Sequence, residues 1–238
     1  MKRFALITVA AVAVAAVVLP TALASPHHGP SSSKSGGSVK TWRVTIANLT
    51  PPGPGAPGSQ PLSPPLFVIH SHSVQIWRPG QIASHVVAAI AEDANNAPAV
   101  SAYTGFPGGV RSAFTGTGGP IPSGSSRTYT VQTRGKLDRL SLVTMLVNTN
   151  DAFTGLDSLH LQGQGRTLKT IAYDAGSETD NQLKADIPGP CCNHPFVRDP
   201  EGAPIHPHAG IQPNVGDLDP ATYGWTGPVA KITIVRIP

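Results

Sequence analysis

Carboxylates are concentrated in two short stretches of this 238-residue chain, NTNDAFTGLDS at 148–158 and YDAGSETDN at 173–181. Only thirteen Asp and Glu residues occur in all, and five of them lie here: Asp151, Asp157, Asp174, Glu178 and Asp180. Crowded carboxylates repel one another, and few Lys or Arg residues follow closely enough in the sequence to neutralise them. Calcium relieves such repulsion by taking about six to eight oxygen ligands from carboxylates, carbonyls and water. The alternative is that these residues only form turns, where Asp is common, and their spacing matches no EF-hand loop.

The two acidic stretches begin where predicted strands end. The strand expected at 139–149 runs into Asn148 and then Asp151, and the strand expected at 166–174 ends at Asp174. If these strands lie near one another, their ends bring the carboxylates to one rim of the domain. Ala-Gly-Ser separates Asp174 from Glu178 and forms a flexible turn that lets both side chains converge.

Two His-x-His pairs, His70/His72 and His206/His208, offer a different metal chemistry. Residues two apart on a strand face the same side, so each pair could present two imidazoles to zinc or copper. If both pairs met, they would form a four-imidazole or an open three-imidazole site, as a secreted metalloenzyme could use. Otherwise these are ordinary strand or loop histidines that bond to the backbone.

Other enzyme classes have little support in the sequence. No G-x-S-x-G nucleophile motif occurs. Paired acids could serve a glycosidase, but aromatic residues make up only 5% of the chain, and no aromatic groove for a sugar is evident. We therefore expect a protein that is not an enzyme.

The amino-terminal segment is typical of a secretory signal peptide. Lys2 and Arg3 precede an apolar run, and Ala22-Leu23-Ala24 forms a small-residue cleavage site. We predict a signal peptide at 1–24, a flexible tether at 25–37 and one domain at 38–238, hence a secreted protein without a membrane span after cleavage. Loss of Lys2 and Arg3 lowers the formal net charge from +4 to +2, which does not indicate a nucleic-acid binder.

The two cysteines, Cys191 and Cys192, are adjacent. They cannot join distant parts of the chain, so disulfides do not hold this fold together. In an oxidising compartment they form either a vicinal disulfide or a pair of thiols.

Apolar alternation and turn residues predict an all-β domain. Gly and Pro number 25 each, and charged residues are only 13%, as in proteins with short strands and many turns. The proline-rich segment 50–65 is predicted to be a long surface loop, and 80–93 to be the one short helix. About eight strands are expected, and the clearest runs lie at 39–49, 66–77, 127–133, 139–149, 158–163, 166–174 and 228–237. This pattern predicts an antiparallel β-sandwich.

The chain resembles the spondin amino-terminal domain, the module of F-spondin and mindin that also occurs in bacterial secreted proteins. The resemblance lies in separated blocks, in the order that the family shows, over roughly 38–238: PLSPPLFVIH (61–70), MLVNTNDAFTGLDSL (145–159), YDAGSETDN (173–181), EGAPIHPHAGI (201–211) and PVAKITIVRI (228–237). It implies an eight-stranded, C2-like β-sandwich that binds calcium.

The resemblance also implies a ligand set. Asp151 corresponds to the Asp of the first family loop, and Asp174 and Glu178 correspond to the two acids of an Asp-Ala-Gly-Thr-Asp segment. Glu178 departs from that pattern by one methylene, and Ala152 stands where animal members have Trp. Asp151, Asp174 and Glu178 are thus the expected direct ligands of Ca²⁺, with Asn150, Asp157 and Asp180 as outer candidates.

The expected function is that of a secreted, calcium-binding module in extracellular binding or adhesion. Animal relatives act in the matrix together with thrombospondin-type repeats, which this sequence lacks, so adhesion is an analogy from the fold. The partner is expected to be an extracellular protein or polysaccharide, or another copy of the chain. The alternatives are a zinc or copper metalloprotein that uses the His-x-His pairs, and a purely structural matrix protein.

Overall fold

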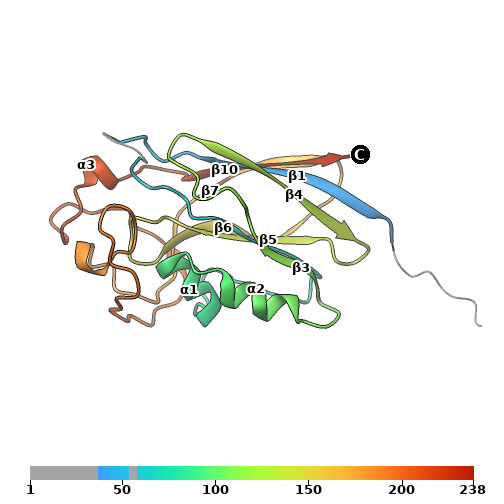
Figure 1. Ribbon diagram of the computed structural model, residues 1–238, viewed down its shortest axis with the longest axis horizontal. Coiled ribbons are helices and arrows are strands. Elements are labelled where there is room, and N and C mark those ends of the chain that lie inside the picture. The colour runs from blue at the N-terminus through green and yellow to red at the C-terminus, as the bar shows by residue number, and fades with distance from the viewer. Residues whose placement is uncertain (1–36, 54–57) are drawn as a thin grey trace, which may run out of the picture. The chain divides into compact units, whose positions relative to one another are not determined.

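Two antiparallel sheets form the body of the protein. The structure, a computed structural model, describes residues 37–53 and 58–238. The predicted signal peptide and the predicted tether up to residue 36 lie outside the described residues. The described chain forms the expected all-β sandwich, with few helices (Figure 1).

The first sheet has four strands in the order β4-β1-β10-β7. Its strands are β1 (Val39–Asn48), β4 (Ser126–Arg134), β7 (Gly165–Thr170) and β10 (Ala230–Ile237). Along β1, Trp42, Val44 and Ile46 are buried while the residues between them are more exposed. This period of two is that of a strand with one face on the core and one face toward solvent.

The second sheet has six strands in the order β3-β2-β5-β6-β8-β9. Both of its faces are covered, because the first sheet packs on one side and helices pack on the other (Figure 1). All five residues of β2 are therefore buried. The strands are β2 (Leu66–His70), β3 (Val110–Thr115), β5 (Arg139–Met145), β6 (Ala152–His160), β8 (Tyr173–Asp174) and β9 (His206–Pro207).

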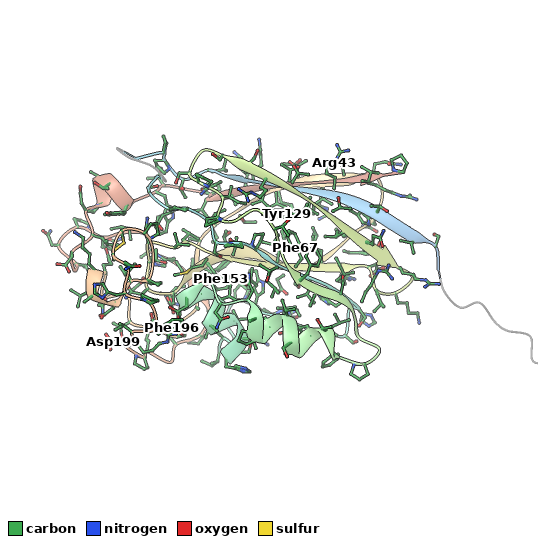
Figure 2. The ribbon with its side chains drawn as sticks, viewed as in Figure 1. Arg43, Phe67, Tyr129, Phe153, Phe196 and Asp199 are labelled. Carbon is green, nitrogen blue, oxygen red and sulfur yellow. A yellow bond between two sulfur atoms is a disulfide. The ribbon has the colours of Figure 1, made fainter. Side chains whose placement is uncertain are left out.

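Apolar side chains fill two layers, one on each side of the second sheet. Phe67 and Tyr129 pack between the sheets with ring centroids 4.9 Å apart. Phe153 packs on the opposite side with Trp77 and the helix α1 (His85–Asp93), beside α2 (Ala97–Thr104) (Figure 2). Two short helical turns, Lys184–Asp186 and α3 (Pro220–Tyr223), belong to the long carboxy-terminal connections.

Most predicted strands are present, with shifted ends. The strand expected at 66–77 ends at His70, and residues beyond it form turns. The strand expected at 158–163 begins at Ala152, immediately after Asp151, so most of the first acidic stretch is strand rather than loop. The helix starts at His85, and α2, β3 and β9 were not predicted.

The prediction of a surface loop at 50–65 is wrong for its second half. Ser59, Gln60 and Leu62 are buried, and Leu62 forms isolated bridges with Ile121 and Leu146. Prolines exclude a segment from the middle of a sheet but not from single bridges beside one. Residues 54–57 lie outside the described part of the chain.

Cys191 and Cys192 form a disulfide, so the first of the two expected states is present. Both side chains pack against a small apolar cluster of Ile187, Ile211 and Leu218. None of the helices described has the length and apolar character needed to cross a membrane.

Candidate metal site

The register of three strands brings the two acidic stretches together. Ala152 on β6 pairs with Asp174 on β8, and Asp174 pairs with His206 on β9. Asp151 is the residue before β6, so it lies beside Asp174 although 23 positions separate them in sequence. The predicted convergence of these two acids at one end of the strands therefore occurs.

The two carboxylate oxygens of Asp151 have contrasting surroundings. Oδ2 accepts hydrogen bonds from the Ser177 amide (2.8 Å), the Ser177 hydroxyl (3.1 Å) and the Glu178 amide (2.9 Å). Oδ1 is fully buried and has no hydrogen-bond partner among the described residues. Burial, reinforced by the charge of Asp174, raises the pKa of Asp151 to about 7. A buried acceptor without a partner is costly, so this oxygen calls for a proton or a cation.

Three further side chains meet next to Asp151. Ligand atoms of Asp174, Asp180 and His208 all lie within 4.8 Å of one another. Asp174 Oδ1 accepts the Gly176 amide at 2.6 Å, and burial followed by the charge of Asp180 raises the pKa of Asp174. The carboxylates of Asp174 and Asp180 both add to the raised pKa of Asp151, so the four groups share one electrostatic environment.

His208 is a buried imidazole within this cluster. Its Nε2 lies 3.0 and 3.1 Å from the two oxygens of Asp180, and its ring lies 5.3 Å from that of Trp225. Burial alone would lower the pKa of His208, but the hydrogen bond and charge of Asp180 outweigh it and raise the pKa. Sequence reasoning placed His208 only in the His-x-His alternative and missed its place beside the acids.

Glu178 belongs to the same loop, but its carboxylate faces another group. Arg198 Nη1 lies 3.4 Å from Glu178, Arg198 Nε lies 2.7 Å from Glu92, and Arg198 also pairs with Asp93. Burial and then the charge of Glu92 raise the pKa of Glu178 to about 8, against the opposing effect of Arg198. The hydrogen bond from Glu178 to Asp151 comes from its backbone amide.

Of the three outer candidates, two lie in or beside the cluster and one lies apart from it. Asp180 lies in the cluster. Asn150 joins the two stretches, because its Oδ1 accepts the Gln182 amide and its Nδ2 donates to Asn181. Asp157 lies six residues further along the chain on β6 and pairs with Arg78, apart from the other acids.

The two His-x-His pairs do not form a joint site among the described residues. His70 is buried, and both of its ring nitrogens are engaged, with the Ser71 carbonyl (2.8 Å) and the Ser141 hydroxyl (2.9 Å). In the described part of the chain, the cluster of three candidate ligands contains His208 but neither His70 nor His72. His206 Nε2 lies 3.7 Å from Asp174.

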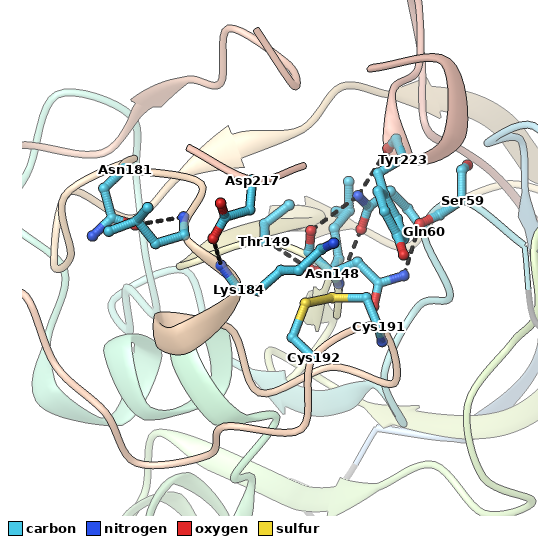
Figure 3. Close-up of a disulfide and its surroundings, with 12 residues drawn as sticks. Ser59, Gln60, Asn148, Thr149, Asn181, Lys184, Cys191, Cys192, Asp217 and Tyr223 are labelled. Atoms are coloured by element: carbon cyan, nitrogen blue, oxygen red, sulfur yellow. Dashed lines mark hydrogen bonds between the residues drawn. A yellow bond between two sulfur atoms is a disulfide. The ribbon is translucent and has the colours of Figure 1, made fainter. Parts of the chain in front are cut away.

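Asn148 fixes the start of the first acidic stretch. Its side chain donates to the Ser59 carbonyl and accepts the Cys191 amide, and its backbone bonds to the Gln60 side chain (Figure 3). The buried segment at 59–60 and the disulfide turn thus hold the loop that carries Asp151.

Two comparisons with known proteins bear on the family of this chain. A search of the curated proteins finds no match. The Spondin_N family model matches residues 57–185, more than half of the chain, a span that includes Asp151, Asp174 and Asp180. This match confirms the predicted resemblance, and the chain belongs to the spondin amino-terminal domain family.

Proposed function

We propose that this protein is a secreted, calcium-binding module of the extracellular space that binds a partner and is not an enzyme. The spondin family supports an extracellular binding role. The observation that carries the metal proposal is the buried, unpartnered Oδ1 of Asp151 beside the carboxylates of Asp174 and Asp180. Calcium prefers oxygen ligands of this kind and neutralises the charge that burial makes costly.

The ligands proposed are Asp151, Asp174 and Asp180. Glu178, expected from the resemblance as the third ligand, would have to leave Arg198 before its carboxylate could serve. Asp180 already has an oxygen within 4.8 Å of Asp174. Comparing Asp180→Asn with Glu178→Gln assigns the third position, because loss of calcium affinity follows only the residue that coordinates.

Thermal melting in EDTA and in calcium tests the site. At ten times Kd, a bound ion adds about 1.4 kcal/mol to folding stability, which corresponds to a rise in Tm of about 3–6 °C for a domain of this size. Extracellular sites often have Kd near 10⁻⁴–10⁻³ M, so we expect the rise at roughly millimolar calcium. Asp174→Ala should abolish it.

Asp157→Ala is the matched control, because it removes a carboxylate outside the cluster. It should keep the full response to calcium. If Asp174→Ala folds and responds as the unmodified protein does, the calcium assignment is wrong. Calcium titration of Asp174→Asn by calorimetry gives the same answer where the alanine variant does not fold.

A second candidate is a zinc-binding protein that uses the same cluster. It is favoured by the position of His208, since an imidazole with two carboxylates is a ligand set that suits zinc. Metal analysis of protein purified without a histidine tag separates the candidates. Stoichiometric zinc that is lost in His208→Ala supports the second, and calcium alone supports the first.

A further inference from the structure

Positive charge is segregated on the four-stranded sheet. Eight of the fourteen described Lys and Arg residues lie within β1, β4, β7 and β10, and none of the thirteen Asp and Glu does. These four strands carry a formal charge of +8. The remaining described chain has six Lys or Arg against thirteen carboxylates, a formal charge of −7. A weak net charge thus conceals two regions of opposite sign.

Four of these cations lie on the outer face of the sheet. Arg43, Arg134, Lys169 and Lys231 are exposed and occupy alternate positions to the residues that face the core. Figure 2 shows Arg43 on the side of the sheet opposite to Phe67 and Tyr129. None of the four forms an ion pair with another described residue.

Strand pairing places these cations at even intervals along the direction of β1, although only Arg43 belongs to that strand. Lys231 pairs with Ala47 on one side and with Lys169 on the other. Arg43 follows four residues along β1, and Arg134 pairs with Val39, four residues further. At about 3.4 Å per residue, each step is about 14 Å. Lys231 and Lys169 are directly opposed like charges, which is unfavourable unless an anion lies between them.

Hydroxyl groups fill the space between the cations. One row of threonines crosses all four strands between the lysine pair and Arg43: Thr128, Thr45, Thr233 and Thr167. Thr45 bonds to Thr128 at 2.9 Å, and Thr167 bonds to Thr233 at 3.2 Å. Each hydroxyl can donate one bond and accept others, so the row can pair with a ligand that carries both kinds of group.

We propose that this outer face binds an acidic polysaccharide, a chain of uronate or sulfated sugars laid along β1. Repeated anions would meet the lysine pair, Arg43 and Arg134 in turn, and sugar hydroxyls would meet the threonine row. The inference rests on the proposed role as a binding module but not on the metal site, which lies on the other sheet.

The same face does not suit the other polyanions. The aromatic residues of its strands, Trp42 and Tyr129, point into the core, so no ring is presented for the stacking on which single-stranded nucleic acid depends. A flat sheet face presents no helix or ribbon to a duplex groove. The exposed apolar residues, Val39 and Val235, are too few to insert into a lipid surface.

Binding of immobilised heparin and polygalacturonate to the full chain, in EDTA, tests the proposal. We expect salt-dependent binding to at least one of the two and none to neutral dextran. Lys169→Gln/Lys231→Gln should weaken it about tenfold and lower the slope of log K against log salt by about two, one for each lost cation. Adding Arg43→Gln to this double variant should weaken polysaccharide binding further.

The matched control is Arg78→Gln/Lys184→Gln, which removes the same charge from residues outside the four strands and away from Arg134. Equal weakening by both pairs would overturn the proposal, because net charge alone would then explain binding. Equal affinity for duplex DNA or for anionic vesicles, or binding to neither acidic polysaccharide, would overturn it as well. Binding that appears only with calcium would place the ligand at the metal site instead. Binding in EDTA does not depend on the metal site, so failure of the EDTA arms leaves the calcium melt unaffected.

Discussion

At the residue scale, Asp151 and Glu178 are buried acids whose charges are handled differently. Asp151 has three donors on one oxygen and none on the other, whereas Glu178 shares Arg198 with two acids of α1. Burial raises the pKa of both. The difference is that Arg198 contacts the Glu178 carboxylate, whereas no described residue contacts Oδ1 of Asp151 with a donor or a cation.

Asp151→Asn should abolish the response to calcium without lowering the melting temperature in EDTA. The amide has the same shape but removes a buried charge beside Asp174. Differential scanning calorimetry at pH 7.5 measures both effects, and Asp157→Asn is the control. A retained calcium response would exclude Asp151 as a ligand.

Arg198→Gln should destabilise the protein by about 3 kcal/mol, near the lower limit for a broken buried pair because the Arg198 side chain is 36% exposed. The change leaves Glu92, Asp93 and Glu178 without their shared cation. Urea denaturation at neutral pH measures the loss. Arg78→Gln, which breaks an exposed pair with Asp157, should cost less than about 1 kcal/mol. Similar losses in the two variants would contradict this account.

At the element scale, β6 carries Asp151 to the site, and its contact with β5 depends on a residue without a side chain. A Cβ at Gly155 would lie 1.9 Å from the Leu142 carbonyl oxygen. The strand can therefore pair closely with β5 only with glycine there. The position of Asp151 depends on this pairing, because Asp151 directly precedes the strand.

Gly155→Ala should cost about 2–3 kcal/mol through overpacking and should weaken calcium binding. Gly105→Ala is the control, since its Cβ would have no neighbour closer than 3.9 Å and its φ is −84°. That variant should change stability by less than about 0.5 kcal/mol. Chemical denaturation compares the two, and equal stability would show that β6 has room to shift.

At the scale of the whole molecule, charge is arranged by region. Four cations of one sheet lie on its outer face, and Asp151, Asp174 and Asp180 gather at an end of the other sheet. The pKa values of Asp151, Asp174 and His208 in the acid cluster are raised, and so is that of Glu178 in the same loop. These four groups therefore hold more protons in the folded chain than in the unfolded chain between the ordinary carboxyl range and about pH 8. Burial lowers the pKa of His70 and so acts in the opposite direction, but it is one group against four.

In EDTA, stability should consequently fall as the pH rises from about 5 to 8. Raised acids lose their protons at a cost in the folded state, and a raised histidine loses a favourable charge, so both effects have the same sign. Melting temperatures across this range measure the trend. Calcium should reduce the fall by supplying positive charge at pH 8, and a flat or rising profile in EDTA would contradict the cluster.

Strands could be predicted from the sequence where the pattern of neighbouring residues is enough to identify them. Alternation identified β1, β4 and β10 nearly to the residue, because a strand with one buried face repeats every two positions. It missed β3, extended β2 beyond its end at His70, and placed the buried segment 59–63 at the surface. Alternation does not report burial that comes from packing on both faces of a strand. The family match at 57–185 leaves the wider extent of the resemblance, 38–238, as a prediction.

The candidate site, too, was predicted in part from the sequence and decided in part by the tertiary structure. The sequence alone showed that acids are scarce and that five of them crowd into two short stretches. The convergence of Asp151 and Asp174 was expected, but only the tertiary structure placed Asp180 and His208 in the same cluster, turned Glu178 toward Arg198 and aligned four cations on one face. The reason is physical: alternation decides which side of a strand a residue occupies, but the pairing of strands distant in sequence decides which residues become neighbours.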